Sequence, residues 1–272
     1  MSDLLKTRPR NSAFTLVELL VVIAIIGILA SLAAVGVMKV LERSKMVVAR
    51  IEISQLEAAV SAAKLDLGNV DELPSVIRLY NTPAGFAGDA VTFDFLNKAF
   101  GKSWQANAAC PWMGASYSGS YPVTLTGMEA LVFWLGGIRD TSGLFQGFSS
   151  AKATPWDITT TKRKGPYYDF DTKRIVTNAN IPSYVNSWEG PYLYISKTFY
   201  NSGPFSGVNA YRKVNTTTAS SYYNAKTFQL ISSGQDQSFG PGGVYNPPFA
   251  IGTPGYDDLA NFSSTQLGKK DE

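Results

Sequence analysis

The chain has 272 residues, of which 45% are hydrophobic, and its formal net charge is +3. This length suits one mid-sized domain together with an anchor, and so small a charge gives no reason to expect a nucleic-acid partner. Histidine is absent, which excludes imidazole base catalysis and histidine-ligated zinc or haem. The sequence also lacks a nucleophile motif and a glycine-rich phosphate loop, so we expect no enzyme.

The N-terminus divides into a short polar segment and a long apolar one. Residues 1–13 are polar and basic, and residues 14–38 then contain a single charge, Glu18. About 20 apolar residues suffice to span a bilayer as a helix. A cleaved secretory signal has a shorter apolar region, with its small residues after that region rather than before it. A plain membrane anchor leaves Glu18 unexplained, because a carboxylate inside a membrane span is costly and indicates a function.

The signature at the start of this apolar segment is similar to that of type IV pilins and type II secretion pseudopilins. Residues 12–29 read Ser-Ala-Phe-Thr-Leu-Val-Glu-Leu-Leu-Val-Val-Ile-Ala-Ile-Ile-Gly-Ile-Leu. The resemblance implies that a prepilin peptidase cuts on the cytoplasmic side between Ala13 and Phe14 and methylates the new amine. The family usually has glycine before the cut, and Ala13 is small enough to fit. The resemblance also implies that Glu18 pairs with the N-terminal amine of a neighbouring subunit.

Physical chemistry agrees with this role for Glu18. After cleavage the amine of Phe14 is a cation at the end of an apolar helix, and Glu18 lies one turn away, where the helix dipole favours an anion. A buried ion pair specifies register more than it stabilises, and the loss of one partner leaves an uncompensated charge. We therefore interpret Glu18 as the residue that directs filament assembly.

From Lys39 the pattern becomes amphipathic, and we predict one helix from Phe14 to Leu67 whose second half, residues 39–68, packs on a globular head. Gly68 is a natural stop after this helix. The predicted packing stripe recurs three to seven residues apart. It consists of Leu41, Val48, Ile51, Gln55, Ala59, Ala63 and Leu67, widened by Met46, Leu56 and Val60.

Residues 69–272 contain short aromatic and β-branched runs between turn signals, which is typical of short strands and long loops. We therefore predict an α+β fold, with the long helix on a small antiparallel sheet. Thr126–Leu135 is predicted to be a short helix, with Thr126 as its N-cap and glycines after it. The single cysteine, Cys110, cannot form a disulfide within the chain and is expected to be a small buried hydrophobe rather than an intermolecular link.

Two strands around a tight turn are predicted at Tyr167–Asp171 and Arg174–Thr177. Asp169 and Asp171 alternate along the first of them and are spaced like a carboxylate pair. Because no partner acid or base lies near them in the sequence, we favour a solvated strand face.

Three later segments resemble, in their order, the major pseudopilins of type II secretion. They are residues 186–196 (Asn-Ser-Trp-Glu-Gly-Pro-Tyr-Leu-Tyr-Ile-Ser), 228–236 (Phe-Gln-Leu-Ile-Ser-Ser-Gly-Gln-Asp) and 256–262 (Tyr-Asp-Asp-Leu-Ala-Asn-Phe). In that family a Trp-Gly-x-Pro-Tyr strand precedes a second strand that ends in Ser-x-Gly-x-Asp-Gly. Here Glu189 is inserted before the first glycine, and Gln237 replaces the last one.

The same resemblance implies calcium in the C-terminal loop, held by Asp236, Asp257 and Asp258. Ca²⁺ takes six to eight oxygen ligands, and carboxylates with loop carbonyls supply them. The spacing is not that of an EF-hand. The alternative is a solvated hairpin with acidic residues on its rim.

Three classes of function are left open by the sequence. They are a structural subunit of a secretion pseudopilus acting in protein export, a type IV pilus subunit for adhesion, motility or DNA uptake, and an anchored enzyme or binding module. The calcium-type C-terminus favours the first, and the third has no supporting motif. The resemblance implies a homo-oligomeric filament, with prepilin peptidase, an inner-membrane assembly platform, minor pseudopilins and, before assembly, membrane lipid as partners. It also implies a single pass through the bacterial inner membrane with the head in the periplasm, followed by a periplasmic or extracellular filament.

Overall fold

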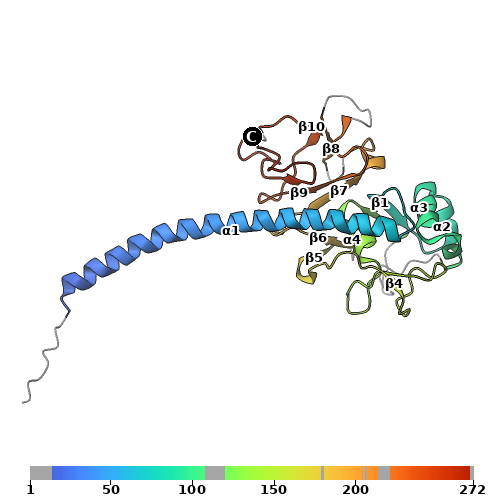
Figure 1. The fold of residues 1–272 in the computed structure, drawn as a ribbon, viewed down its shortest axis with the longest axis horizontal. Helices are drawn as coiled ribbons and strands as arrows, with labels where there is room; N and C mark the ends of the chain where they lie inside the picture. The colour runs from blue at the N-terminus through green and yellow to red at the C-terminus, as the bar shows by residue number, and fades with distance from the viewer. Residues whose placement is uncertain are drawn as a thin grey trace, which may run out of the picture. The chain divides into compact units, whose positions relative to one another are not determined.

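The computed structural model describes residues 14–107, 120–178, 181–203, 205, 207–213 and 221–269 (Figure 1). The expected leader, residues 1–13, and Cys110 lie outside these residues. By its internal contacts the chain divides into two compact units, Met1–Lys45 and Met46–Glu272.

Helix α1 spans Leu16–Asp66, which confirms the predicted helix over Phe14–Leu67 to within two residues at each end. It stops where Gly68 was predicted to stop it. Gly68 has a φ of 93°, in the left-handed region that glycine adopts without strain. The N–H of Val70 then donates to the carbonyl of Lys64 at 3.0 Å, so the turn back satisfies a carbonyl at the helix end.

The part of α1 in the first unit exposes its apolar side chains. α1 is long and apolar enough to cross a membrane, and its most apolar stretch contains no buried residue. Exposed apolar side chains run from Phe14 through Leu41. A surface of this kind is stable in lipid or against other apolar helices, rather than in water.

The buried face of α1 in the second unit differs in part from the predicted stripe. Val48, Ile51 and Gln55 are exposed, as is Leu41 in the first unit, so these predictions were wrong. The residues that are buried are Ala49, Glu52, Ile53, Leu56, Ala59, Val60, Ala63 and Leu67. The buried face is rotated relative to the predicted one for two reasons. Small alanine side chains allow the head to pack closely against α1, and the carboxylate of Glu52 has hydrogen-bond partners in the head.

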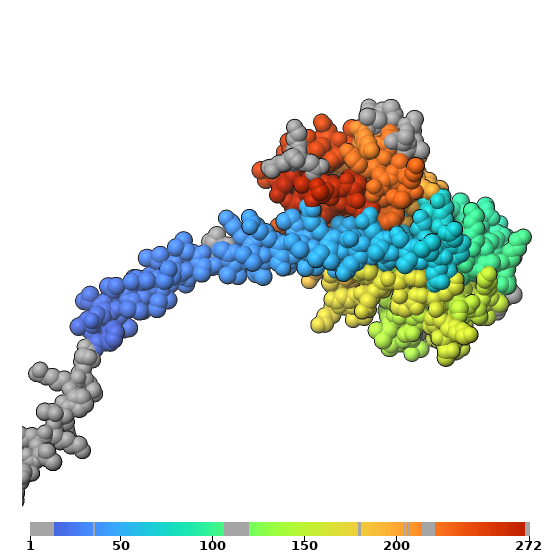
Figure 2. All heavy atoms as spheres, viewed as in Figure 1, coloured from blue at the N-terminus to red at the C-terminus, as the bar shows by residue number. Residues whose placement is uncertain are grey.

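In the second unit, this part of α1 runs between two groups of elements (Figures 1 and 2). The C-terminal strands, drawn in orange to red, lie on one side, and the segment with β4 to β6 lies on the other. Hydrogen bonds confirm both contacts, because Asn261 donates to Glu57 at 2.7 Å and Arg174 donates to Glu52 at 2.8 Å. This part of α1 therefore contributes one buried face to the hydrophobic core, while its other face stays exposed.

Helix α4, Met128–Gly136, is almost entirely buried, which explains its continuous apolar sequence. Its start differs from the prediction. The cap position is Gly127, with a φ of 54°, whereas Thr126 is the last residue of β2. The backbone N–H of Thr126 donates to Glu129 at 3.0 Å, so this threonine contacts the first turn without capping it. Gly137 ends the helix, as predicted.

The remaining helices, α2 and α3, are short and precede α4; they span Pro83–Ala87 and Ala90–Phe100. Among the described residues the strands form several small sheets rather than one. The antiparallel pairs are β1–β2 (Val76–Leu79 and Val123–Thr126), β3–β4 (Phe148–Ser149 and Arg163–Lys164) and β5–β6 (Ile175–Asn178 and Ile181–Tyr184). One pair, β8–β10 (Asn209–Arg212 and Gly242–Val244), is parallel.

The central sheet is antiparallel, in the order β11-β9-β7. Its strands are β7 (Tyr192–Ser196), β9 (Phe228–Ser232) and β11 (Leu259–Ala260). Every residue of the three strands is buried, so the sheet is covered on both faces. The predicted α+β class is confirmed, and the sheet lies in the C-terminal segments whose sequences resemble the major pseudopilins.

One predicted strand pair was wrong. Tyr167–Asp171 is not a strand, because Asp171 caps a short 3₁₀ turn by accepting from the N–H of Lys173 at 3.0 Å. β5 begins directly after that turn and pairs with β6 instead. Asp169 and Asp171 are both exposed, in agreement with solvated acids rather than a catalytic pair.

Candidate functional site

The N-terminal end of α1 carries the residues that the sequence marks for processing and assembly. Ala13 lies outside the described residues, and Phe14 is 78% exposed. Thr15 and Glu18 form a capping box, in which Glu18 Oε2 accepts from the N–H of Thr15 at 2.8 Å and Thr15 Oγ1 accepts from the N–H of Glu18 at 3.2 Å. The Glu18 carboxylate is therefore oriented by its own helix, and its side chain is exposed.

The second candidate site is a cluster of three acidic residues at one end of the central sheet. Asp236 follows β9, whereas Asp257 and Asp258 directly precede β11. Because Leu259 of β11 pairs with Ser232 of β9, these two segments meet at the same end of the sheet. One carboxylate oxygen from each of the three acids lies within 4.8 Å of the others. The structure thus brings together the residues that the sequence predicted as calcium ligands.

Backbone N–H groups hold the three carboxylates in place. Asp257 Oδ2 accepts from the N–H of Asp236 at 3.1 Å and from the N–H of Gln235. Asp258 Oδ2 accepts from the N–H of Gly240 at 3.0 Å, and Asp236 Oδ1 accepts from the N–H of Ser238 at 2.8 Å. The turn needs glycine at Gly234, which has a φ of 63° and on which a Cβ would lie 2.6 Å from the Asp257 side chain. The geometry of the cluster is therefore fixed by the loop backbone.

The electrostatics of the cluster are unfavourable without a cation. Asp258 is fully buried, and its Oδ1 has no hydrogen-bond partner among the described residues. Burial, with Asp257 and Asp236 close by, raises the pKa of Asp258 to about 7. Burial also raises the pKa of Asp236, and the nearby Asp257 adds to this rise. A bound cation would supply the missing partner and remove the repulsion between the carboxylates.

The chemistry of these donors fits a hard divalent cation. Asp236, Asp257 and Asp258 would hold it through carboxylate oxygens, which both Ca²⁺ and Mg²⁺ prefer. Ca²⁺ tolerates irregular loop geometry and takes further oxygens from carbonyls and water, whereas Mg²⁺ demands near-ideal octahedral coordination. An irregular loop with one buried, unpartnered carboxylate oxygen therefore suits Ca²⁺ better.

Hydrogen bonds within and from the turn before β7 stabilise the end of the central sheet at which the acidic cluster lies. Asn186 Oδ1 accepts from the N–H groups of Trp188 and Gly190, both at 2.9 Å, and Asn186 Nδ2 donates to Ser232 Oγ at 2.9 Å. The two departures from the pseudopilin pattern both occur where the backbone has a positive φ, 66° at Glu189 and 59° at Gln237. Gln237 therefore adopts a conformation that favours glycine, in agreement with the family's glycine at this place.

A buried polar network around Glu52 was not predicted from the sequence. Its carboxylate accepts two hydrogen bonds from the guanidinium of Arg174 and one from the hydroxyl of Tyr192, at 2.7 Å. The guanidinium of Arg174 also lies 4.5 Å from the ring centre of Tyr184. The only signal in the sequence was a glutamate in phase with the apolar residues Ile53, Leu56 and Val60.

Comparisons with known proteins agree with the N-terminal motif. Residues 8–34 match the family described as the prokaryotic N-terminal methylation motif. Over 59 residues, or 22% of the chain, the sequence is 42% identical to the type II secretion system core protein G of Pseudomonas aeruginosa, and the match covers 42% of that protein. No solved structure matches the chain. The N-terminus is thus of the prepilin type, and part of the chain is similar to a core protein of a type II secretion system.

Proposed function

We propose that the chain is a structural subunit of a pilus-like filament, and that this filament is a type II secretion pseudopilus acting in protein export. The main support for this proposal is the N-terminal segment. A methylation-type motif over residues 8–34 leads into a helix long and apolar enough to cross a membrane. Glu18 is the single charge within residues 14–38. The similarity to core protein G and the acidic C-terminal cluster favour secretion over a type IV pilus.

In this proposal α1 first anchors the protein in the inner membrane, with the head in the periplasm. Prepilin peptidase removes residues 1–13 and methylates the amine of Phe14. α1 then leaves the lipid for the filament core, where its exposed apolar side chains pack against neighbouring helices. Lipid chains are as apolar as these side chains, so burial alone gives little preference for one register. The pairing of the Phe14 amine with Glu18 of a neighbouring subunit supplies that preference.

The acidic cluster serves in this proposal as a calcium site that orders the C-terminal loops of the head. Neutralising three carboxylates at the end of β9 and β11 stabilises the folded head in a calcium-containing compartment. The three acids, the buried and unpartnered Asp258 Oδ1 and the irregular loop support this role.

The proposal is tested by the mass of the N-terminus and by filament recovery. Mass spectrometry of the membrane fraction should find a protein that begins with N-methylated Phe14. Glu18→Ala should be processed and inserted like the wild type, but should give no filaments in cells that lack the wild-type subunit, because a neighbour's amine then has no partner. Glu42→Ala, which removes an exposed acid further along the same helix, is the matched control and should assemble. An unprocessed N-terminus, or normal filaments from Glu18→Ala, would refute the proposal.

A further inference from the structure

A band of basic residues follows the apolar part of α1. Residues 14–38 contain one charge, Glu18, and residues 39–50 then contain four basic residues and one acid. The first two cations are Lys39 and Arg43, and both are exposed. Because they are four residues apart in one helix, they lie on the same face, about 6 Å apart along the axis. The filament role proposed above assigns no task to these two cations.

The length of the apolar run sets the depth of these cations in a bilayer. A helix rises about 1.5 Å per residue, so Phe14 and Lys39 are about 37 Å apart along α1. The hydrocarbon core of a bilayer is about 30 Å thick, and the head groups extend it to about 40–45 Å. With Phe14 among the head groups on one side, Lys39 lies among those on the other side, and Arg43 lies about 6 Å further out. Long basic side chains at this depth reach phosphate oxygens while their stems stay on apolar surface.

The protein itself does not use these two cations within the part of the chain that the structure describes. Neither Lys39 nor Arg43 makes a hydrogen bond or an ion pair there. Arg50, the next arginine of α1, differs from them because its guanidinium donates to the carbonyl of Ser264 in the head. Lys39 and Arg43 can therefore bind a partner outside the chain.

The chemistry at this depth identifies the partner. Positive charge beside a span is normally kept in the cytoplasm, so cations on the outer side oppose insertion unless a contact offsets them. Phosphate is the anion at this depth, and arginine binds it through two parallel N–H···O bonds. Near an anionic lipid surface, each cation adds about fivefold to the affinity.

We infer that Lys39 and Arg43 bind the head group of an anionic phospholipid, such as phosphatidylglycerol, in the outer leaflet of the membrane. The bound lipid holds the chain at a fixed depth before assembly, and it must be released when α1 leaves the bilayer. The inference rests on the proposed function in one respect, that α1 crosses the membrane with the head outside.

The inference is tested with the full-length protein and defined lipids. The protein in a neutral detergent is mixed with equal amounts of phosphatidylglycerol and phosphatidylcholine, and native mass spectrometry counts the lipids that stay bound. Both lipids carry a phosphate, but only the first has a net negative charge. The wild type should retain phosphatidylglycerol in preference, and Lys39→Gln with Arg43→Gln should lower the ratio of the two bound lipids at least about fivefold. Lys39→Arg keeps the charge and should keep the preference.

The matched control removes two cations from the head. Lys102→Gln with Lys152→Gln makes the same change in net charge at two exposed positions outside α1, and it should bind lipid like the wild type. The basic leader is the same in every variant, so it does not affect the comparison. An equal loss of preference in this control would overturn the inference, because net charge rather than Lys39 and Arg43 would then select the lipid.

Two further outcomes separate this inference from the proposed function. If the wild type is inserted in the membrane but shows no preference, or if Lys39→Gln with Arg43→Gln keeps the full preference, the lipid contact is overturned and the filament proposal is unaffected. If alkaline carbonate extracts the wild type from membranes, the membrane anchor of the proposed function is refuted, and this inference is refuted with it.

Discussion

Glu52 lies on the buried face of α1 within the second unit, where the residue is 7% exposed. Removing a carboxylate and a guanidinium from water costs several kcal/mol per ion, and only good geometry with further hydrogen bonds offsets this. Here the Glu52 carboxylate receives both Nη groups of Arg174 and the hydroxyl of Tyr192, and Arg174 also donates to the carbonyl of Val185. A network so well satisfied fixes how the helix and the head pack against each other.

We expect Glu52→Met to lower the free energy of unfolding by about 3–5 kcal/mol, because it leaves the charge of Arg174 buried and unpaired. The double variant Glu52→Met with Arg174→Met should recover most of that loss, since no unpaired charge then remains. Urea unfolding followed by circular dichroism measures both, with the full-length protein in detergent.

The ion pair of Arg78 with Asp89 is the matched control, because Arg78 is 51% exposed in its side chain. Arg78→Met should cost less than about 1 kcal/mol, because the lost guanidinium is half exposed and Asp89, whose side chain is 7% exposed, keeps its hydrogen bonds from Thr92. Equal losses from Glu52→Met and Arg78→Met would mean that the Glu52 network adds no more than a surface contact.

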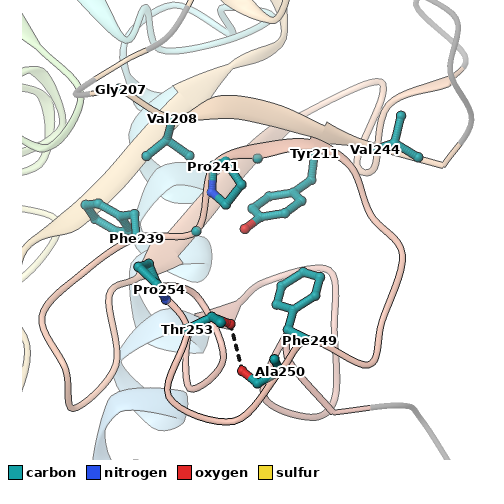
Figure 3. A pocket seen from close by; sticks show the side chains of 12 residues that line it. Gly207, Val208, Tyr211, Phe239, Pro241, Val244, Phe249, Ala250, Thr253 and Pro254 are labelled. Atoms are coloured by element: carbon teal, nitrogen blue, oxygen red, sulfur yellow. Dashed lines mark hydrogen bonds between the residues drawn. The ribbon is translucent and has the colours of Figure 1, made fainter.

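At the scale of elements, two loops of the head form the acidic cluster and also line a neighbouring pocket. The loop after β9 carries Asp236 and then Gly240, and the loop before β11 carries Pro254 and then Asp257 and Asp258. Gly240 and Pro254 also line a pocket of about 630 Å³ beside the acidic cluster (Figure 3). The N–H of Gly255 donates to the carbonyl of Ser238 at 3.2 Å, which joins the two loops. The three acids of the cluster therefore lie on two loops that contact each other.

Calcium should stabilise the head through these loops. At a free Ca²⁺ concentration a hundredfold above Kd, the free energy of unfolding should rise by about 2.7 kcal/mol, and Mg²⁺ should have a smaller effect. Thermal melts of the full-length protein in detergent, with calcium, magnesium or a chelator, measure this difference. Asp236→Asn and Asp258→Asn should each remove most of the calcium effect, because each deletes a charged ligand of the cluster.

Asp169→Asn is the control for these variants, because Asp169 is an exposed acid outside the cluster. It should keep the full response to calcium. If the wild type melts at the same temperature in calcium and in chelator, the cluster is a solvated rim rather than a calcium site. The type IV pilus would then be better supported than the secretion pseudopilus.

A feature of the structure could be predicted from the sequence when the residues that determine it are neighbours in the chain. The ends of α1 were predictable because a continuous apolar run and Gly68 act through their neighbours in the chain. The acidic cluster was predicted through the resemblance, which places the strand ends as well as the acids. The buried face of α1 was predicted only in part, because Ala49 is buried while the more hydrophobic Val48 is exposed. The partnership of Glu52 with Arg174 joins positions 122 residues apart, and no local pattern encodes it.

At the scale of the whole head, buried tyrosines set how stability depends on pH. Burial is the main cause that raises the pKa of each of these phenols above its ordinary value, by a large margin for Tyr192 and Tyr194. The tyrosines are Tyr184, Tyr192, Tyr194, Tyr200 and Tyr211. Their hydroxyls contribute to the core in the neutral form; that of Tyr194, for example, donates to the carbonyl of Leu73 at 2.6 Å. The folded head therefore retains these protons in alkaline solution.

We expect the head to unfold sharply at alkaline pH. Below about pH 10, the ordinary pKa of tyrosine, folded and unfolded chains hold the same phenolic protons, and these groups give no pH dependence. Above it the unfolded chain loses protons that the folded chain keeps, so each such tyrosine lowers the free energy of unfolding by up to about 1.4 kcal/mol per pH unit. Urea unfolding over a pH series measures this slope, and tyrosinate absorbance should appear together with unfolding rather than before it.

Tyr211→Phe separates this titration from packing. Its hydroxyl is buried without a hydrogen-bond partner within the described residues, so the variant should be at least as stable as the wild type at neutral pH. Above about pH 10 its free energy of unfolding should fall less steeply with pH than that of the wild type, because one fewer proton is released on unfolding. The slopes should differ by the contribution of one tyrosine. Tyr194→Phe should reduce the slope equally but should also cost about 1 kcal/mol at neutral pH, because Leu73 loses its donor. An unchanged slope in both variants would show that other groups cause the alkaline transition.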